Sequence, residues 1–100
     1  MLYDLAPDYL IRRDQFRDEH LPLASEASDR GELILAGALS DPVDGAVLLF
    51  EGESPEVAER FAAADPYVRH GLVTCWRVRL WTTVAGKNAA SRVKPKERNS

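Results

Sequence analysis

Two hydrophobic patterns follow one another in the N-terminal third of the chain. Residues 2–5 are mostly apolar and Pro7 follows closely, which is typical of a short strand. Between residues 8 and 30 the apolar side chains recur every three or four positions, as on one face of a helix, and Gly31 provides a stop. The pattern therefore predicts a strand and then a helix. The apolar stripe of this helix consists of Phe16, His20, Leu23 and Ala27.

Pro22 lies inside the predicted helix. Proline has no backbone N–H, and its ring strains the turn that reaches back to Asp18. We therefore expect a kink at Pro22, or a short first helix followed by a second one.

Two short apolar runs, residues 32–37 and 46–50, predict a pair of strands. Both are too short and too continuously apolar for a surface helix. The segment between them, DPVDG at residues 41–45, concentrates residues that favour turns. The two strands are therefore expected to form a hairpin with a rather long loop.

A second helix is predicted to begin at Ser54-Pro55-Glu56. Serine is a common N-cap, proline suits the first helical position, and glutamate is favourable near the positive end of the helix dipole. The helix has to end at Asp65, because the residue before Pro66 is pushed out of helical geometry.

Residues 72–84 alternate with a period of two, which predicts a long last strand. Its two faces carry Thr74, Trp76, Val78 and Leu80 on one side, and Cys75, Arg77, Arg79 and Trp81 on the other.

The predicted order of elements is β-α-β-β-α-β, an α+β fold of the ferredoxin-like type. In this fold two helices cover one face of a four-stranded antiparallel sheet. The other face, with valine, leucine and Trp81 available to it, would expose an apolar patch. A two-fold homodimer that buries sheet against sheet is the economical arrangement.

The composition, with 45% hydrophobic and 29% charged residues, is ordinary for a soluble globular protein. No apolar run approaches the roughly 20 residues that span a bilayer, and the N-terminal residues lack the pattern of a signal peptide. We therefore expect a cytoplasmic protein with no membrane partner.

The C-terminal residues 87–100 form a basic tail. They carry five basic residues and one acidic residue, a charge of +4, so the preceding residues carry −7 within the formal net charge of −3. The tail is short, polar and non-periodic, so a solvated, disordered segment is expected rather than an arm that binds RNA or acidic lipid. Residues 1–86 are predicted to be the folded domain, and no nucleic-acid partner is expected.

Cys75 is the only cysteine, so an intrachain disulfide is impossible, and no Cys/His group has the spacing of a zinc site. We predict no metal and no cofactor. A thiol inside a predicted strand is expected to be a small buried hydrophobic residue.

The two histidines differ in their predicted surroundings. His70 lies in a polar turn beside Gly71 and is expected to be solvated. His20 lies on the apolar helical stripe, which allows two interpretations: a histidine at the edge of the core that donates to a backbone carbonyl, or a functional group.

Asp65 also allows two interpretations. It can be the N-cap of a short following turn, with Pro66 at the first helical position. Alternatively, it can reach His20 and orient the imidazole as an acid-base pair. Spacing in the sequence does not choose between them.

Three arginines on the first helix, Arg12, Arg13 and Arg17, could bind an anion near His20. On a helix that is also rich in acidic residues, surface ion pairs are the commoner outcome. Tyr67, fixed beside Pro66, could present its hydroxyl to a pocket or cover the end of the second helix.

Several short motifs occur in order over about residues 1–84. They are Arg17-x-x-His20-Leu21, Gly31-Glu32-Leu33 with Ala36-Gly37, Ser54-Pro55-Glu56, and Asp65-Pro66-Tyr67-Val68 followed by Gly71-Leu72. Together they resemble the YCII-related (YciI-like) proteins. The resemblance implies a dimeric α+β barrel and an active site of one His and one Asp, which map onto His20 and Asp65. It also implies a small bacterial protein in a family of mostly unknown function, in which a dehydrochlorinase acting on a chlorinated hydroxyquinol is the best-known activity.

Two functional hypotheses follow. The first is a small cofactor-free enzyme in which His20 is the general base or acid, Asp65 orients it, and Arg17 or Tyr67 holds a developing oxyanion. Its substrate would be a small aromatic or enolisable molecule, in an elimination, isomerisation or lyase step. The alternative is a non-catalytic dimeric module that binds a small molecule or docks on a larger enzyme.

Overall fold

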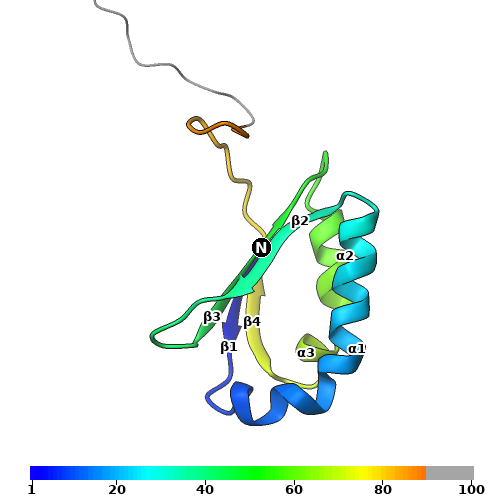
Figure 1. Ribbon diagram of the computed structural model, residues 1–100, viewed down its shortest axis with the longest axis vertical. Helices are drawn as coiled ribbons and strands as arrows, with labels where there is room; N and C mark the ends of the chain where they lie inside the picture. The colour runs from blue at the N-terminus through cyan, green and yellow to red at the C-terminus, as the bar shows by residue number, and fades with distance from the viewer. Residues whose placement is uncertain (90–100) are drawn as a thin grey trace, which may run out of the picture.

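The computed structural model describes residues 1–89, so most of the predicted basic tail lies outside the described residues. All six predicted elements are present, and a short third helix is added after the second (Figure 1). The elements are β1 (Leu2–Leu5), α1 (Tyr9–Asp29), β2 (Leu33–Ala38), β3 (Gly45–Phe50), α2 (Glu56–Ala64), α3 (Pro66–Arg69) and β4 (Val73–Arg77).

The strands form one four-stranded antiparallel sheet in the order β2-β3-β1-β4. The predicted hairpin of β2 and β3 is confirmed, with Leu35 opposite Leu49 and Gly37 opposite Val47. Figure 1 shows all three helices on one side of the sheet and none on the other. The prediction of an α+β fold with helices over one face of an antiparallel sheet is therefore confirmed.

Helix α1 runs from Tyr9 to Asp29 with Pro22 inside it. The alternative of two separate helices is therefore wrong. Both Pro22 and Asp18 are exposed, so water can bind the Asp18 carbonyl that proline leaves without its usual donor. The predicted stripe does face the sheet: Ala27 is buried, and Phe16 and Leu23 pack against the core.

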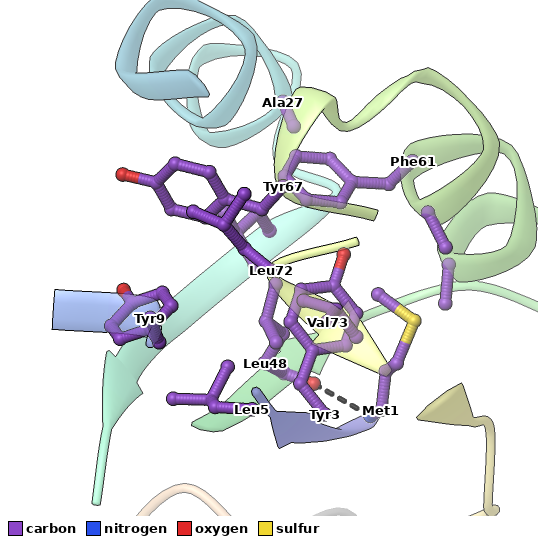
Figure 2. Packing of buried hydrophobic residues seen from close by; sticks show 13 residues of the cluster. Met1, Tyr3, Leu5, Tyr9, Ala27, Leu48, Phe61, Tyr67, Leu72 and Val73 are labelled. Carbon is purple, nitrogen blue, oxygen red and sulfur yellow. Dashed lines mark hydrogen bonds between the residues drawn. The ribbon is translucent and has the colours of Figure 1, made fainter. Parts of the chain in front are cut away.

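The core fills the space between the sheet and the helices (Figure 2). Leu72 has no exposed surface, and Tyr3, Leu48 and Phe61 are all buried. Figure 2 also marks the hydrogen bond of 2.7 Å by which the Met1 amine donates to the Leu48 carbonyl. The strands β1 and β3 and the helix α2 are thus held together around one apolar layer.

Strand β4 ends at Arg77, so the predicted strand over residues 72–84 is too long. Its pairing with β1 ends there, since Arg77 lies opposite Leu2, the first residue of β1. Figure 1 shows the chain leaving the sheet after β4. In this departing segment Leu80 is 92% exposed and Trp81 is 64% exposed.

The predicted alternation is broken inside β4, because the register with β1 shifts between Asp4 and Leu5: Val73 is buried, and both Thr74 and Cys75 are exposed. Trp76 lies opposite the buried Tyr3, whereas Cys75 lies opposite the exposed Asp4. Cys75 is exposed, so the prediction of a buried thiol is wrong. The reason is that Cys75 falls on the face of the sheet that no helix covers.

The uncovered face of the sheet is apolar along β2 and β3. Leu35 is 70% exposed and Val47 is 37% exposed. Leu49, opposite Leu35, and Leu2, opposite Val47, add half-buried side chains to the same face. These four residues are called the open face below. None of the helices in residues 1–89 is long and apolar enough to cross a lipid bilayer.

Candidate functional site

Asp65 is the one fully buried charged side chain among the described residues, with 0% exposure. It stands where α2 ends and α3 begins, and the following Pro66 keeps its backbone extended, with ψ at 119°. Its Oδ1 accepts a hydrogen bond of 3.0 Å from the backbone N–H of Tyr67. The prediction that Asp65 caps a short turn with proline at its start is therefore confirmed.

The same carboxylate also reaches His20. Nδ1 of His20 lies 2.7 Å from Oδ1 of Asp65, and the Tyr3 hydroxyl donates to Oδ2 at 2.8 Å. One buried carboxylate thus both caps a helix and contacts the imidazole. A carboxylate removed from water needs such partners, and here two side chains and one backbone N–H supply them.

The contact of 2.7 Å between Nδ1 of His20 and Asp65 sets the tautomer of a neutral His20 that faces an ionised carboxylate. An ionised carboxylate can only accept, so Nδ1 has to be the donor, and Nε2 of the neutral ring keeps a free lone pair. The ring is stacked on Tyr67, with centroids 3.9 Å apart and planes at 8°, and meets the edge of Phe61 at 6.3 Å. Within residues 1–89, no protein group pairs with Nε2. The imidazole is therefore held on three sides and available at Nε2.

His20 lines a pocket of about 290 Å³ between α1 and the sheet, called the His20 pocket below. Its lining includes Arg13, Arg17 and Tyr67. Four apolar strand residues of the lining are called the floor below: Leu5, Ala36, Ala46 and Leu48. Three of the four predicted site residues, His20, Arg17 and Tyr67, thus share one pocket. The fourth, Asp65, stands behind His20 and does not line it.

The model of the YCII-related domain matches residues 1–82 of the chain. The chain belongs to the YCII-related family. The resemblance read from the short motifs is thereby confirmed. No curated protein and no solved structure matches the chain significantly.

Both tyrosines near the carboxylate of this YCII-related protein are protonated donors at neutral pH. Burial, followed by the charge of Asp65 and the hydrogen bond to it, raises the pKa of the Tyr3 hydroxyl well above its ordinary value. Burial raises the pKa of Tyr67 to about 12; Tyr9 and Asp65 add to the rise, while Arg17 and Arg13 oppose it. The Tyr67 hydroxyl can therefore donate to an oxygen in the pocket.

Sequence reasoning missed Tyr3 and Tyr9 as parts of this site, and it named Arg13 only together with Arg12 and Arg17 as a possible anion binder. Tyr3 carried a usable signal, because a tyrosine at an inward position of a strand brings a hydroxyl that needs a partner. Tyr9 and Arg13 line the His20 pocket through their place on α1. His70 lies outside the pocket; it is exposed, and its ring also stacks on Phe16 at 4.4 Å.

A larger hollow of about 670 Å³ lies elsewhere, between β3 and the segment after β4. Its lining includes Val47, Leu49, Leu80 and Trp81, but no histidine or tyrosine. The predicted site residues His20, Arg17 and Tyr67 therefore lie at the smaller pocket. Within residues 1–89, no group of three or more His, Cys, Asp or Glu side chains is placed to hold a metal ion.

The raised pKa values of Tyr3 and Tyr67 give a prediction for alkaline pH. Below about pH 10 both hydroxyls are protonated in the folded and unfolded states. Above it the unfolded state releases protons first, so each raised group lowers the free energy of unfolding by up to about 1.4 kcal/mol per pH unit. We expect Tyr3→Phe to show a shallower loss than the parent between about pH 10 and 12, measured by urea unfolding at several pH values. Equal slopes would show that Tyr3 ionises normally in the folded protein.

Proposed function

We propose that this chain is a small enzyme without a cofactor that moves a proton on a small aromatic or enolisable molecule. The observation that supports it is the state of His20: its Nδ1 is bound by the fully buried Asp65, and its Nε2 is free at the His20 pocket. Such a carboxylate holds the imidazole in one tautomer and stabilises the imidazolium that forms when Nε2 takes a proton. This arrangement suits a general base.

The other lining groups suit the negative charge that proton removal creates. In an elimination, Nε2 takes a proton from carbon, the electron pair of that C–H bond forms the new double bond, and the leaving group departs with its own pair. The imidazolium then returns its proton to solvent. Where the charge gathers on a substrate oxygen, the Arg17 guanidinium and the Tyr67 hydroxyl can stabilise it. Isomerisation and lyase steps need the same proton transfer.

The pocket favours these reactions over acyl transfer. Its lining contains no serine, threonine or cysteine that could act as a nucleophile. Peptide hydrolysis is therefore disfavoured.

The test is turnover by the parent protein on a panel of chlorinated hydroxyquinols and small enolisable ketones and acids. Chloride release and the uptake of solvent deuterium, followed by NMR, report elimination and proton abstraction separately. We expect saturable turnover of at least one compound class. If no compound reacts faster than in buffer alone, the enzyme hypothesis loses its support.

The non-catalytic module remains the second candidate, and one observation favours it. The bonds that hold His20 also serve the fold, since Asp65 caps α3 and binds Tyr3. A His-Asp contact of purely structural value would leave the His20 pocket as a binding site for a small molecule.

We further propose that the protomer is ferredoxin-like and that two copies pair through the open face as a dimeric α+β barrel. The strand order β2-β3-β1-β4 and the exposure of Leu35 and Val47 support this proposal. Leu80 and Trp81, which are exposed beside the larger hollow, extend the same apolar surface. In a two-fold symmetric contact, both protomers would bury these side chains against each other.

We expect Val47→Asp to convert the dimer into monomers. A two-fold interface would bury two unpaired carboxylates, which is strongly unfavourable. Sedimentation equilibrium at tens of micromolar measures the mass as one or two chains. The control is Leu10→Asp, which also replaces an exposed apolar side chain by a carboxylate but lies on α1, where Leu10 is 52% exposed. A parent protein that sediments as one chain, or a dimeric Val47→Asp, would contradict this interface.

A further inference from the structure

The three arginines of α1 have different surroundings. Arg12 is engaged at the surface: its Nη2 donates to the His70 carbonyl at 2.7 Å, and Nη1 lies 3.9 Å from the Asp8 carboxylate. Arg13 and Arg17, one helical turn apart, both line the His20 pocket. The expectation of ordinary surface ion pairs therefore fits Arg12, fits Arg13 only through a contact of 3.9 Å to the exposed Asp14, and does not fit Arg17.

Within residues 1–89, Arg13 has one loose counter-ion at the surface, and Arg17 has none. Nε of Arg13 is buried and has no hydrogen-bond partner. Its nearest carboxylate, on Asp14, is 3.9 Å away, and the Asp14 side chain is 84% exposed. Arg17 has neither an ion pair nor a hydrogen bond to another described residue.

The protein's own carboxylate at this site does not neutralise the two cations. Asp65 is fully buried behind His20 and already accepts from three donors. Like charges four residues apart on a helix repel each other, and a buried N–H without an acceptor is unfavourable. Both charges also act inside the pocket, since Arg17 and Arg13 lower the pKa of the Tyr67 hydroxyl against the effect of burial. An anion in the pocket would relieve both the repulsion and the missing bond.

The size and the apolar floor of the pocket indicate which kind of anion fits. A volume of about 290 Å³ corresponds to roughly ten water molecules, so a single ring or a short branched chain fits. The floor of Leu5, Ala36, Ala46 and Leu48 is apolar and suits a hydrocarbon body. Guanidinium groups bind planar carboxylates through paired hydrogen bonds.

We propose that the ligand of the His20 pocket is a small organic carboxylate with an apolar body. Arg13 and Arg17 bind the carboxylate, and the body lies on the floor beside Nε2 of His20. This inference rests on the proposed function in using the same pocket, and it names the substrate class. Arg13 becomes a binding residue in addition to Arg17 and Tyr67.

The test uses benzoate as the probe, with benzamide as its neutral counterpart and phenyl phosphate as the other anion. Amide signals of the parent protein are followed by two-dimensional NMR during each titration. We expect benzoate to shift signals of α1 around residues 13–21 and that of Tyr67, to bind at least tenfold more tightly than benzamide, and to bind more weakly as salt is added. Arg13→Gln and Arg17→Gln should each weaken benzoate binding at least tenfold. Arg12→Gln, the matched control, should change it less than twofold.

Each other outcome overturns the proposal. Equal binding of benzamide, or unchanged binding in both Arg13→Gln and Arg17→Gln, would remove the role of the two charges. Tighter binding of phenyl phosphate than of benzoate would mean that the ligand is a phosphate ester rather than a carboxylate. If benzoate shifts no signals at about 20 mM, where even very weak binding would be detected, the pocket has no anion site.

The same probe separates this inference from the proposed function. His20→Gln should retain benzoate binding, because it leaves both arginines in place. If benzoate binds the parent and no substrate turns over, the carboxylate site stands and the enzyme hypothesis falls. If a substrate turns over and benzoate does not bind, the enzyme hypothesis stands and the carboxylate site falls.

Discussion

Replacing Asp65 by Ala is expected to lower the free energy of unfolding by about 3–5 kcal/mol, the largest stability effect at the site. The change removes the acceptor of three donors at once: His20, the Tyr3 hydroxyl and the Tyr67 backbone N–H. Each buried donor left unpaired costs about 1–3 kcal/mol, although these costs do not add fully, and losing the cap of α3 costs about 1 kcal/mol more. Urea unfolding followed by tryptophan fluorescence measures the loss.

Two further variants sharpen this measurement. Asp65→Asn keeps the shape and one acceptor oxygen but points an N–H₂ at a donor, so its loss should be smaller, about 2–3 kcal/mol. Asp18→Ala, an exposed change on α1, should stay within about 0.5 kcal/mol of the parent. A loss below about 1 kcal/mol for Asp65→Ala would mean that water replaces the carboxylate easily and that the buried carboxylate contributes little to the free energy of unfolding.

The order of elements was predictable because each element carries its own local signal. The apolar stripe of α1, the Ser54-Pro55-Glu56 start of α2 and the turn residues between β2 and β3 all act within a few positions. The His20 and Asp65 contact was predictable as a possibility for the same reason. His20 faces the sheet from the stripe, and Pro66 fixes the end of the helix at Asp65.

The features that sequence reasoning missed depend on partners far along the chain. Strand β4 ends at Arg77, where its pairing with β1, more than 70 positions earlier, also ends. Cys75 is exposed because all the helices cover the opposite face. Which of Arg12 and Arg13 faces the pocket depends on the path of α1 over the sheet, and neighbouring charges in the sequence do not reveal it.

The double role of Asp65 decides which residue can test the chemistry. A variant at Asp65 changes the cap of α3, the Tyr3 bond and the imidazole together, so lost activity would not identify the cause. His20 is different. Its side chain is 15% exposed, and after its removal Asp65 still accepts from Tyr3 and from the Tyr67 backbone. Stability and proton transfer can therefore be separated at His20.

We expect His20→Ala to lower kcat by about 10²- to 10⁴-fold on any substrate that the parent turns over, because the only lining imidazole is lost. The free energy of unfolding should fall by no more than about 1 kcal/mol, since water can take the place of Nδ1. His70→Ala is the matched control, because these are the two histidines of the chain and His70 lies outside the pocket. Its kcat should stay within about twofold of the parent.

The combination of the two readouts separates the enzyme from the binding module. A large fall in kcat with a nearly unchanged unfolding curve is the result that acid-base catalysis by His20 requires. An unchanged kcat would exclude His20 as the general base whatever happens to stability. A stability loss of about 1–3 kcal/mol with no turnover in the parent would assign the His-Asp contact to the fold. In that case the buried carboxylate serves α1, α3 and β1, and the His20 pocket keeps only its role in binding.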